Sequence, residues 1–196
     1  VQPDEVAELD GDTVFNCSGY GSRALFGDES MKAIKGHILR VPYDGDEPLP
    51  FSYTYTPSEY GHYAYMYPRK ETVLFGGSYL EGDIDDGEWH GESPTKPMTV
   101  DGVRIPERLY TVTENIMSEY VDISPDKVSA KYGYRPYRAD GMRIEEADGV
   151  VHNYGHGGSG VSMSWWSAIQ AIQHVDDISE DVLPGVASEI AKVNAH

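Results

Sequence analysis

The chain has 196 residues, of which 39% are hydrophobic, 24% charged and 11% aromatic; this composition is ordinary for a globular protein with one sizeable domain or two small ones. Its formal net charge of −18 repels phosphate backbones and anionic lipid, which argues against nucleic-acid and membrane-surface binding. Cys17 is its only cysteine, which excludes an intramolecular disulfide framework and a thiolate metal site.

The first predicted element is a short strand over residues 13–17, closed by a tight turn of small residues at 18–21. A short helix is predicted to begin at residues 22–25. Further strands are predicted, in chain order, over residues 36–41, 63–67, 72–75, 127–134 and 149–153. The second and third of these are joined by a four-residue turn and are expected to form a hairpin.

Two stretches between these strands are predicted to be irregular. Residues 42–50 are rich in Asp and Pro and are expected to form a loop. Residues 76–97 contain five Gly and two Pro, and they are expected to form a long excursion rather than a regular element. A dense acidic patch within this excursion indicates a solvated loop: Asp83, Asp85, Asp86 and Glu88.

Pro106 is predicted to be the first residue of a helix, in which Leu109, Val112 and Ile116 form one apolar face at spacings of i, i+3 and i+7. A second helix is predicted over residues 162–174, and a final amphipathic helix over 179–193. Strands with few helices between them, followed by a strand–loop–helix unit, indicate a mixed α/β or α+β fold.

The sharpest local pattern is the strand–loop–helix unit at residues 150–160, whose loop has four glycines in six positions. Glycine lets the backbone approach a ligand closely, and the N–H groups at a helix N-terminus attract negative charge. The spacing at residues 155–162 matches a nucleotide P-loop, but Val161 occupies the place of the phosphate lysine. The loop therefore binds an anion-like group other than an obvious phosphate, or it is a plain tight turn.

Three segments resemble, in the same order, motifs of the D-amino-acid oxidase family, which includes D-aspartate oxidase and, more distantly, glycine and sarcosine oxidases. Residues 152–160 and the Trp-bearing helix after them resemble the family's C-terminal flavin motif. Residues 14–19 resemble its strand ending in Asn-Cys-Thr-Gly, and residues 133–138 resemble its Gly-Phe-Arg-Pro-Val-Arg. The hairpin at residues 65–77 fits between them, so that the resemblance covers roughly residues 10–175.

The resemblance implies the C-terminal part of an FAD-binding domain, formed by residues 1–30 and 139–196, and an antiparallel-sheet substrate-binding domain at residues 31–138. The family's N-terminal segment, with its Gly-x-Gly-x-x-Gly dinucleotide fingerprint, has no counterpart in the sequence. We expect another segment or chain to supply it, and we expect this chain alone to bind FAD weakly or not at all.

The resemblance also implies the substrate site. Arg135 matches the residue that clamps the substrate carboxylate, for which a guanidinium is suited because it binds a carboxylate bidentately; a structural ion pair is the alternative. Tyr65 matches the tyrosine that supports the same carboxylate, and the Gly158 carbonyl is expected to face the substrate amine. Arg138 is expected to be structural. The second active-site tyrosine is open among four residues, with the first two preferred: Tyr63, Tyr55, Tyr53 and Tyr60.

The flavin is expected to contact the glycine loop and the first turn of the following helix, whose N–H groups stabilise the negative charge that develops on reduction. Cys17 is interpreted as a small buried residue rather than a covalent flavin link. The histidines show no metal spacing, and no metal site is predicted. The expected flavin-binding residues are Ser18, Gly157, Gly158, Ser159, Gly160, Val161 and Ser162.

The implied reaction is hydride transfer from a D-amino acid to FAD, reoxidation by oxygen with release of hydrogen peroxide, and hydrolysis of the imine to a 2-oxo acid and ammonia. Orientation carries most of this catalysis, so no general base is required. The alternatives are a related flavin amine oxidase or dehydrogenase of the glycine or sarcosine type, and a non-catalytic remnant that lacks its FAD-binding half. The expected partners are the D-amino acid, oxygen and the N-terminal FAD-binding segment or chain, and oligomerisation is left open.

Both ends of the sequence bear on completeness and location. Residues 1–8 do not begin with Met and carry no basic, apolar signal, which suggests a processed or incomplete chain. No apolar run approaches the ~18 residues of a membrane span. The last three residues, 194–196, are not the peroxisomal Ser-Lys-Leu address. We therefore expect a soluble protein and, by default, a cytoplasmic one.

Overall fold

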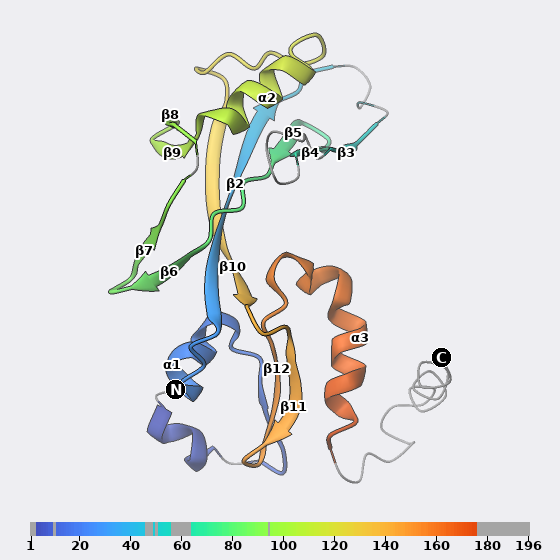
Figure 1. The fold of residues 1–196 in the computed structure, drawn as a ribbon. Helices are drawn as coiled ribbons and strands as arrows, with labels where there is room; N and C mark the ends of the chain where they lie inside the picture. Colours follow the sequence, from blue (N-terminus) through green and yellow to red (C-terminus); the bar gives the residue numbers. More distant parts are fainter. Residues whose placement is uncertain are drawn as a thin grey trace. The chain divides into compact units, whose positions relative to one another are not determined.

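The computed structural model describes residues 3–9, 11–45, 49, 51–55, 64–93 and 95–175. The chain forms two compact units: the first unit consists of Val1–Lys32 and Pro136–His196, and the second unit of Ala33–Arg135. The chain passes between them within strands β2 (Met31–Pro42) and β10 (Ser129–Arg138) (Figure 1). The binding roles expected for residues 1–30, 31–138 and 139–196 stay predictions, and the helix predicted at 179–193 lies outside the described residues.

The first unit contains a mixed three-stranded sheet in the order β1-β12-β11. Strand β1 (Val14–Asn16) runs parallel to β12 (Val150–Tyr154), with Asn16 opposite His152. Strand β11 (Arg143–Ala147) lies antiparallel on the other side of β12. The strands predicted at 13–17 and 149–153 are therefore confirmed. Strand β11 was not predicted, because a short edge strand rich in charged residues lacks the apolar alternation that marks a strand in sequence.

Helix α3 (Gly160–Ile172) packs against β12 and β11 and buries Ser167 and Ala171 (Figure 1). It begins two residues before the predicted start. Helix α1 (Ser22–Phe26) ends at Gly27, whose φ of 63° is the left-handed conformation that glycine adopts readily. The other helical segments among the described residues of the first unit are short 3₁₀ turns: η1 (Pro3–Glu8), η2 (Gly19–Gly21) and η3 (Gly157–Ser159).

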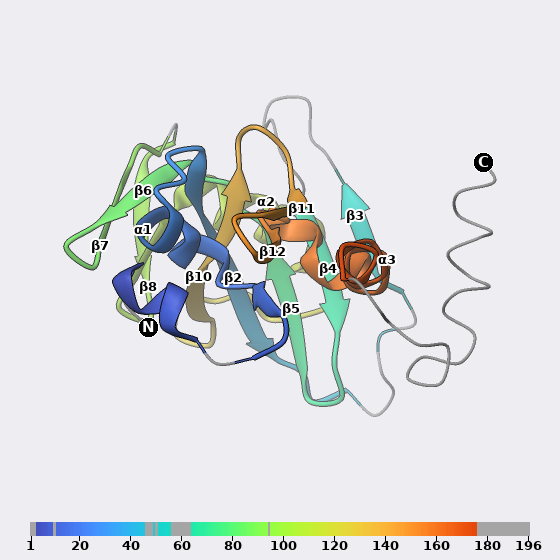
Figure 2. The same cartoon turned by 90° about the horizontal axis from the view of Figure 1, so that it is seen from below.

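The second unit is built on a five-stranded sheet in the order β10-β2-β5-β4-β3, which can be followed in Figure 2. The pairs β2–β5, β5–β4 and β4–β3 are antiparallel. The predicted hairpin is confirmed as β4 and β5, and β3 is a further short strand at the edge. The bounds are β3 (Tyr53–Tyr55), β4 (Ala64–Pro68) and β5 (Thr72–Gly76).

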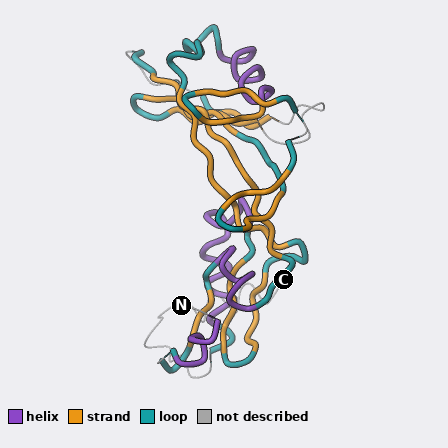
Figure 3. Tube along the Cα trace, turned by 90° about the vertical axis from the view of Figure 1, so that its left-hand side faces the viewer, coloured by secondary structure: helices purple, strands orange, loops and turns teal. Residues whose placement is uncertain are grey.

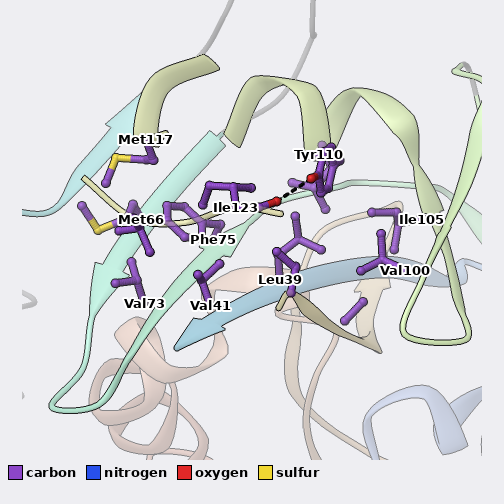
Figure 4. Close-up of a cluster of buried hydrophobic side chains, with 14 residues drawn as sticks. Leu39, Val41, Met66, Val73, Phe75, Val100, Ile105, Tyr110, Met117 and Ile123 are labelled. Carbon is purple, nitrogen blue, oxygen red and sulfur yellow. Dashed lines mark hydrogen bonds between the residues drawn. The ribbon is translucent and has the colours of Figure 1, made fainter. Parts of the chain in front are cut away.

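Helix α2 (Glu107–Met117) covers one face of this sheet and closes the main core (Figures 3 and 4). The Tyr110 hydroxyl donates a hydrogen bond to the Ile123 carbonyl, so the one polar group of this ring is satisfied within the core. Along β2 and β5 the core residues alternate with less buried ones, whereas those of α2 recur at helical spacing. The core includes Leu39, Val41, Met66, Val73, Phe75, Leu109 and Met117.

The predicted apolar face of α2 is wrong. Ile116 is 37% exposed and Val112 is only half-buried, whereas Leu109, Thr113 and Met117 are buried. The face is shifted because Thr113 can enter the core: its hydroxyl donates to the Leu109 carbonyl at 2.8 Å and leaves no polar group unpaired. Pro106 precedes the helix as its N-cap rather than forming its first residue.

The irregular excursion predicted at residues 76–97 is also wrong, because it contains the hairpin of β6 (Gly82–Asp85) and β7 (Glu88–Gly91). At its turn, Asp86 and Gly87 both have positive φ, 49° and 79°. Two-residue hairpin turns of this type match the twist of the flanking strands and favour Asp-Gly. The same dipeptide joins β8 (Pro97–Val100) to β9 (Val103–Pro106), and β11 to β12.

Candidate functional site

The face of the second unit's sheet that is turned away from the core carries the predicted substrate residues. Across three paired strands, Ile38 lies opposite Gly76 and Gly76 lies opposite Tyr65. Directly opposed residues of paired strands point to the same face, and successive residues point to opposite faces. Since Phe75, the residue before Gly76 in β5, is buried in the core, Ile38, Gly76 and Tyr65 belong to the outer face.

Two glycines on this face leave room for side chains that reach across from neighbouring strands. A Cβ on Gly36 would lie 2.2 Å from Arg135 Nη1 and 2.5 Å from its Cζ. A Cβ on Gly76 would lie 2.2 Å from Tyr65 Cζ. The guanidinium from β10 therefore lies over β2, and the phenol ring from β4 lies over β5. Strand spacing and rise place these two glycine positions about 8 Å apart, so the structure brings Arg135 and Tyr65 together on one surface.

Arg135 has one hydrogen bond to the described part of the chain, from Nη1 to the Ser78 carbonyl oxygen at 3.1 Å. No carboxylate within the described ranges lies at ion-pair distance from it. The alternative of a structural ion pair at Arg135 therefore finds no partner among these residues. A guanidinium has five N–H donors, so donors remain for a bidentate bond to a carboxylate. The half-buried position of the side chain strengthens such a bond by keeping water away.

The Tyr65 hydroxyl makes no hydrogen bond to another described residue, and its ring lies 5.3 Å from that of Tyr67, centroid to centroid. Tyr53 lies opposite the core residue Met66, so it points to the core face, where burial raises its pKa to about 12. Tyr53 is thereby removed from the candidates for the second tyrosine. Tyr60 and Tyr63 lie outside the described residues, and so does the Tyr55 side chain.

Next to Arg135, the buried residues His37 and Ser78 form a pair. The His37 backbone N–H donates to Ser78 Oγ at 2.9 Å, and His37 Nδ1 lies 2.7 Å from the same oxygen. Burial lowers the pKa of His37 to about 4, with the charges of Lys35 and Arg135 adding to the effect and the Arg104 backbone opposing it. The imidazole is therefore neutral at physiological pH and adds no charge beside the guanidinium.

In the first unit, a buried hydrogen-bond network holds the end of β1. Asn16 Oδ1 accepts from the Ser18 backbone N–H at 3.1 Å and from the Ser18 hydroxyl at 2.7 Å. Asn16 Nδ2 bonds to Ser22 Oγ at 3.1 Å and to His152 Nδ1 at 3.0 Å, which ties β1 to β12. Ser18 itself is exposed, at the end of the strand. Contrary to the prediction, Cys17 is exposed too, because it follows the last buried position of the strand.

A second network centres on Asp28. Its Oδ2 accepts from the Tyr154 hydroxyl at 2.6 Å and from Arg138 Nε at 2.8 Å, and Arg143 Nη1 donates to the same hydroxyl at 3.1 Å. Arg138 thus forms an ion pair with Asp28, which agrees with the structural role expected of Arg138. Gly155, with a φ of 88°, lets the glycine loop approach this network, because a Cβ there would lie 2.6 Å from Arg138 Cβ.

The glycine loop continues through Gly157, which has a φ of 58°, into the 3₁₀ turn η3 and then α3. The N-cap residue Ser159 makes no side-chain capping bond, and the first turn of α3 has no acidic residue. Gly158 and Ser162 are exposed, and Val161 is 92% exposed. The N–H groups that begin a helix lack intrahelical partners and carry partial positive charge. An exposed, uncapped helix start behind a glycine loop fits a flat ligand edge on which negative charge develops.

The sequence predicted Arg135, Tyr65 and the glycine loop but missed the residues that surround Arg135 and Tyr65: Gly36, Gly76, Ser78 and His37. A glycine inside a strand marks the close approach of another group, and this was the available signal for Gly36 and Gly76. Ser78 and His37 had no such signal, because their roles depend on a contact between distant segments.

No helix of the described residues is long and apolar enough to cross a membrane.

Comparisons with known proteins identify a family to which the chain is similar. The family model for FAD dependent oxidoreductases (DAO) matches residues 2–173. The chain is 34% identical over 176 residues to a D-amino-acid oxidase of Dictyostelium discoideum, covering 87% of this chain and 45% of that protein. It is 32% identical over 177 residues to a D-amino-acid oxidase of Rubrobacter xylanophilus (85% and 47%) and 30% identical over 174 residues to a D-aspartate oxidase of Homo sapiens (85% and 44%).

The chain spans roughly half the length of these curated relatives. Among solved structures, glycine oxidase from Bacillus cereus ATCC 14579 has a similar fold, with a TM-score of 0.54 at 14% identity over 84% of this chain and 43% of that one. That likeness extends to the fold, which is mixed α/β with mostly antiparallel sheets.

Proposed function

Because the chain belongs to the family of FAD-dependent oxidoreductases that includes D-amino-acid oxidases, we propose that it takes part in oxidising D-amino acids. The overall reaction converts the amino acid and oxygen into the imino acid and hydrogen peroxide. Water then hydrolyses the imino acid to a 2-oxo acid and ammonia. When bound, FAD supplies the hydride acceptor and passes the electrons to oxygen.

The observation that carries the proposal is the half-buried Arg135 guanidinium with N–H donors to spare. In our proposal two of these donors bind the two oxygens of the substrate carboxylate, which fixes the orientation of the amino acid as well as its charge. The Tyr65 hydroxyl, on the same sheet face, donates a further hydrogen bond to this carboxylate. Tyr63 is proposed as the second tyrosine, and the Gly158 carbonyl accepts from the substrate amine.

We propose that FAD is held by the glycine loop, the start of α3 and the end of β1, through Ser18, Gly157, Gly158, Ser159, Gly160, Val161 and Ser162. The N–H groups at the helix start stabilise negative charge on the edge of the ligand, whereas carboxylate side chains in their place would repel that charge. Adenosine and pyrophosphate would be bound by a dinucleotide-binding segment or chain outside this sequence. The chain by itself is therefore expected to bind FAD weakly.

The chain's own groups contribute orientation rather than proton transfer in this proposal. His37, whose ring contacts Ser78 beside Arg135, is buried on the core side of β2, and its low pKa of about 4 makes it a poor base at neutral pH. Holding the substrate in one orientation lowers the barrier because the entropy of positioning is lost on binding rather than in the reaction.

The proposal is tested by peroxide release from the chain together with the dinucleotide-binding segment and FAD, with D-alanine and L-alanine in parallel. We expect turnover of the D-isomer alone. Arg135→Lys should lower kcat/KM by about 10–100-fold and Arg135→Ala by about 100–1,000-fold, because a bidentate charge-assisted pair is lost in part or in full. Arg69→Ala, in the exposed turn between β4 and β5, is the matched control and should leave kcat/KM unchanged.

Other outcomes of these assays would indicate one of the alternative functions. Turnover of glycine or N-methylglycine without D-alanine would indicate an amine oxidase of the glycine or sarcosine type. Reduction of an artificial acceptor without peroxide release would indicate a dehydrogenase. A protein without flavin absorbance, even with added FAD and the dinucleotide-binding segment, would indicate a non-catalytic remnant.

A further inference from the structure

We propose that Ser78 and His37 are positioning residues, which lock the Arg135 guanidinium in place for the substrate carboxylate. The inference rests on the proposed role of Arg135. It concerns residues that do not touch the substrate in this scheme, because Ser78 and His37 are 2% and 1% exposed.

The lock begins with the segment that follows β5. Ser78 is held to β2 through two contacts with one residue: its Oγ accepts from the His37 backbone N–H and lies 2.7 Å from His37 Nδ1. Two residues later, Leu80 exchanges backbone hydrogen bonds with Lys35, at 2.8 and 3.1 Å. Both ends of this short segment are therefore fixed to the same strand, and the Ser78 carbonyl between them has a defined direction.

The contact between Ser78 Oγ and His37 Nδ1 is a hydrogen bond in either tautomer of the neutral imidazole, because Oγ can donate to Nδ1 or accept from it. His37 Nε2 is buried and has no hydrogen-bond partner among the described residues, so each tautomer leaves one buried donor unpaired. In both tautomers Ser78 Oγ is bonded to the backbone and to the ring of His37, which makes it a rigid link rather than a rotating hydroxyl.

The other end of the lock is Arg135. Its Nη1 donates to the Ser78 carbonyl oxygen at 3.1 Å, while the guanidinium lies flat over Gly36. The Ser78 carbonyl thus holds one side of the flexible Arg side chain through a hydrogen bond. Gly36 has no side chain, and this leaves the space that the guanidinium occupies. Pre-organisation of this kind lowers the ordering entropy that carboxylate binding would otherwise cost. The remaining guanidinium donors are left for the ligand.

The lock predicts that its loss weakens carboxylate binding more than it slows turnover. Ser78→Ala and His37→Leu should each weaken binding of propionate, a carboxylate without an amino group, by about tenfold and raise KM for D-alanine to a similar extent. The kcat should stay within about twofold, because substrate that has bound meets the same reacting groups. His37→Asn should keep propionate binding within about threefold, because its side-chain amide offers Ser78 Oγ both a donor and an acceptor in place of Nδ1.

The experiment measures propionate inhibition and D-alanine kinetics for the unmodified protein and the three variants, each loaded with FAD in the presence of the dinucleotide-binding segment. If Ser78→Ala does not fold, the pair His37→Leu and His37→Asn still gives the comparison. Equal propionate affinity in His37→Leu and the unmodified protein would overturn the lock. Equal losses in His37→Leu and His37→Asn would overturn it too, since a purely structural role predicts that result.

The outcomes separate this inference from the proposed function. If the unmodified protein oxidises no amino acid and binds no propionate, the proposed function fails, and the positioning role fails with it. If the unmodified protein binds propionate and oxidises D-alanine but the variants behave like it, the positioning role alone fails.

Discussion

At the residue scale, the outer sheet face of the second unit depends on glycines that make room for larger side chains. Gly36 and Gly76 lie under the Arg135 guanidinium and the Tyr65 ring, at distances where a Cβ could not be accommodated. A missing side chain on one strand is thus as important to the proposed site as the side chains that bind. The flexible Arg135 side chain can move away from a substitution at Gly36, whereas the rigid Tyr65 ring has less freedom to move away from one at Gly76.

Gly36→Ala is expected to separate binding from stability. The new Cβ would meet the far end of a flexible side chain, so Arg135 can swing away, and the free energy of unfolding should change by less than about 1 kcal/mol. Because the guanidinium leaves its place beside Ser78, KM for D-alanine should rise about 10–100-fold. The control is Gly133→Ala in β10, where a Cβ would meet nothing within 4 Å. A KM for Gly36→Ala equal to that of this control would contradict the prediction.

Asp28 provides a pH-dependent test in the first unit. Burial raises its pKa, but hydrogen bonds from Tyr154, Arg138 and the Ser30 backbone outweigh burial, and the pKa lies below its usual value. A carboxyl whose pKa is lowered by folding stabilises the protein above its unfolded pKa of about 3.9, and this stability is lost as the pH falls through the folded pKa.

Asp28→Asn should therefore lower the free energy of unfolding by about 2 kcal/mol at pH 7, because the largely buried Arg138 loses its partner. The difference from the unmodified protein should shrink below about pH 4. Urea unfolding of both proteins at pH 7, 5 and 3 measures this difference in the free energy of unfolding. A difference that stays constant across this range would show that the Asp28 charge does not contribute.

At the element scale, the Asp-Gly turns determine where three hairpins form. Asp86, Asp101 and Asp148 have φ values of 49°, 48° and 53°, and each is followed by a glycine with φ above 70°. Few residues adopt this conformation without strain, so the dipeptide itself defines the turn and, through it, the register of the two strands. This explains why a glycine-rich, acidic stretch forms a hairpin rather than a loop.

Gly102→Ala isolates the conformational part of this effect. Gly102 has a φ of 74°, and a Cβ there would meet nothing within 4 Å, so strain in the left-handed conformation is the only cost. We expect the free energy of unfolding to fall by about 1 kcal/mol. In Gly133→Ala, which has equal space but no positive φ, it should stay the same or rise by about 0.5–1 kcal/mol. Equal effects in chemical denaturation would contradict this account.

At the scale of the whole molecule, the net charge of −18 makes folding sensitive to salt. Like charges repel one another more in the compact state than in the extended chain, and salt screens this repulsion over a Debye length of about 10 Å at 0.1 M. Raising NaCl from about 0.02 to 0.3 M should therefore raise the Tm by about 2–4 °C, which corresponds to about 1 kcal/mol for a chain of this size. KCl should act equally, and a flat or falling Tm in thermal unfolding would refute the prediction.

The division into residues 1–30, 31–138 and 139–196 was predicted from the family resemblance rather than from local patterns, and it stays a prediction. The local patterns that did succeed were short-range: the hairpin of β4 and β5, and the unit of β12, the glycine loop and α3. Each is specified by residues within about a dozen positions of one another, because strand alternation, turn residues and helix starts are properties of the local chain. The edge strands β3 and β11 were missed because pairing with a neighbour, rather than their own composition, makes them strands.

The sequence by itself determined which chemical groups the protein can offer: a guanidinium, tyrosines, a glycine loop before a helix, and no cysteine framework. The tertiary structure alone decided which of these groups share a surface. Tyr53 and Tyr65 are similar in sequence context, yet Tyr53 faces the core and Tyr65 lies on the face that carries Arg135. Because side chains alternate along a strand, the register between segments far apart in the chain determines the face of each one, and local sequence does not encode that register.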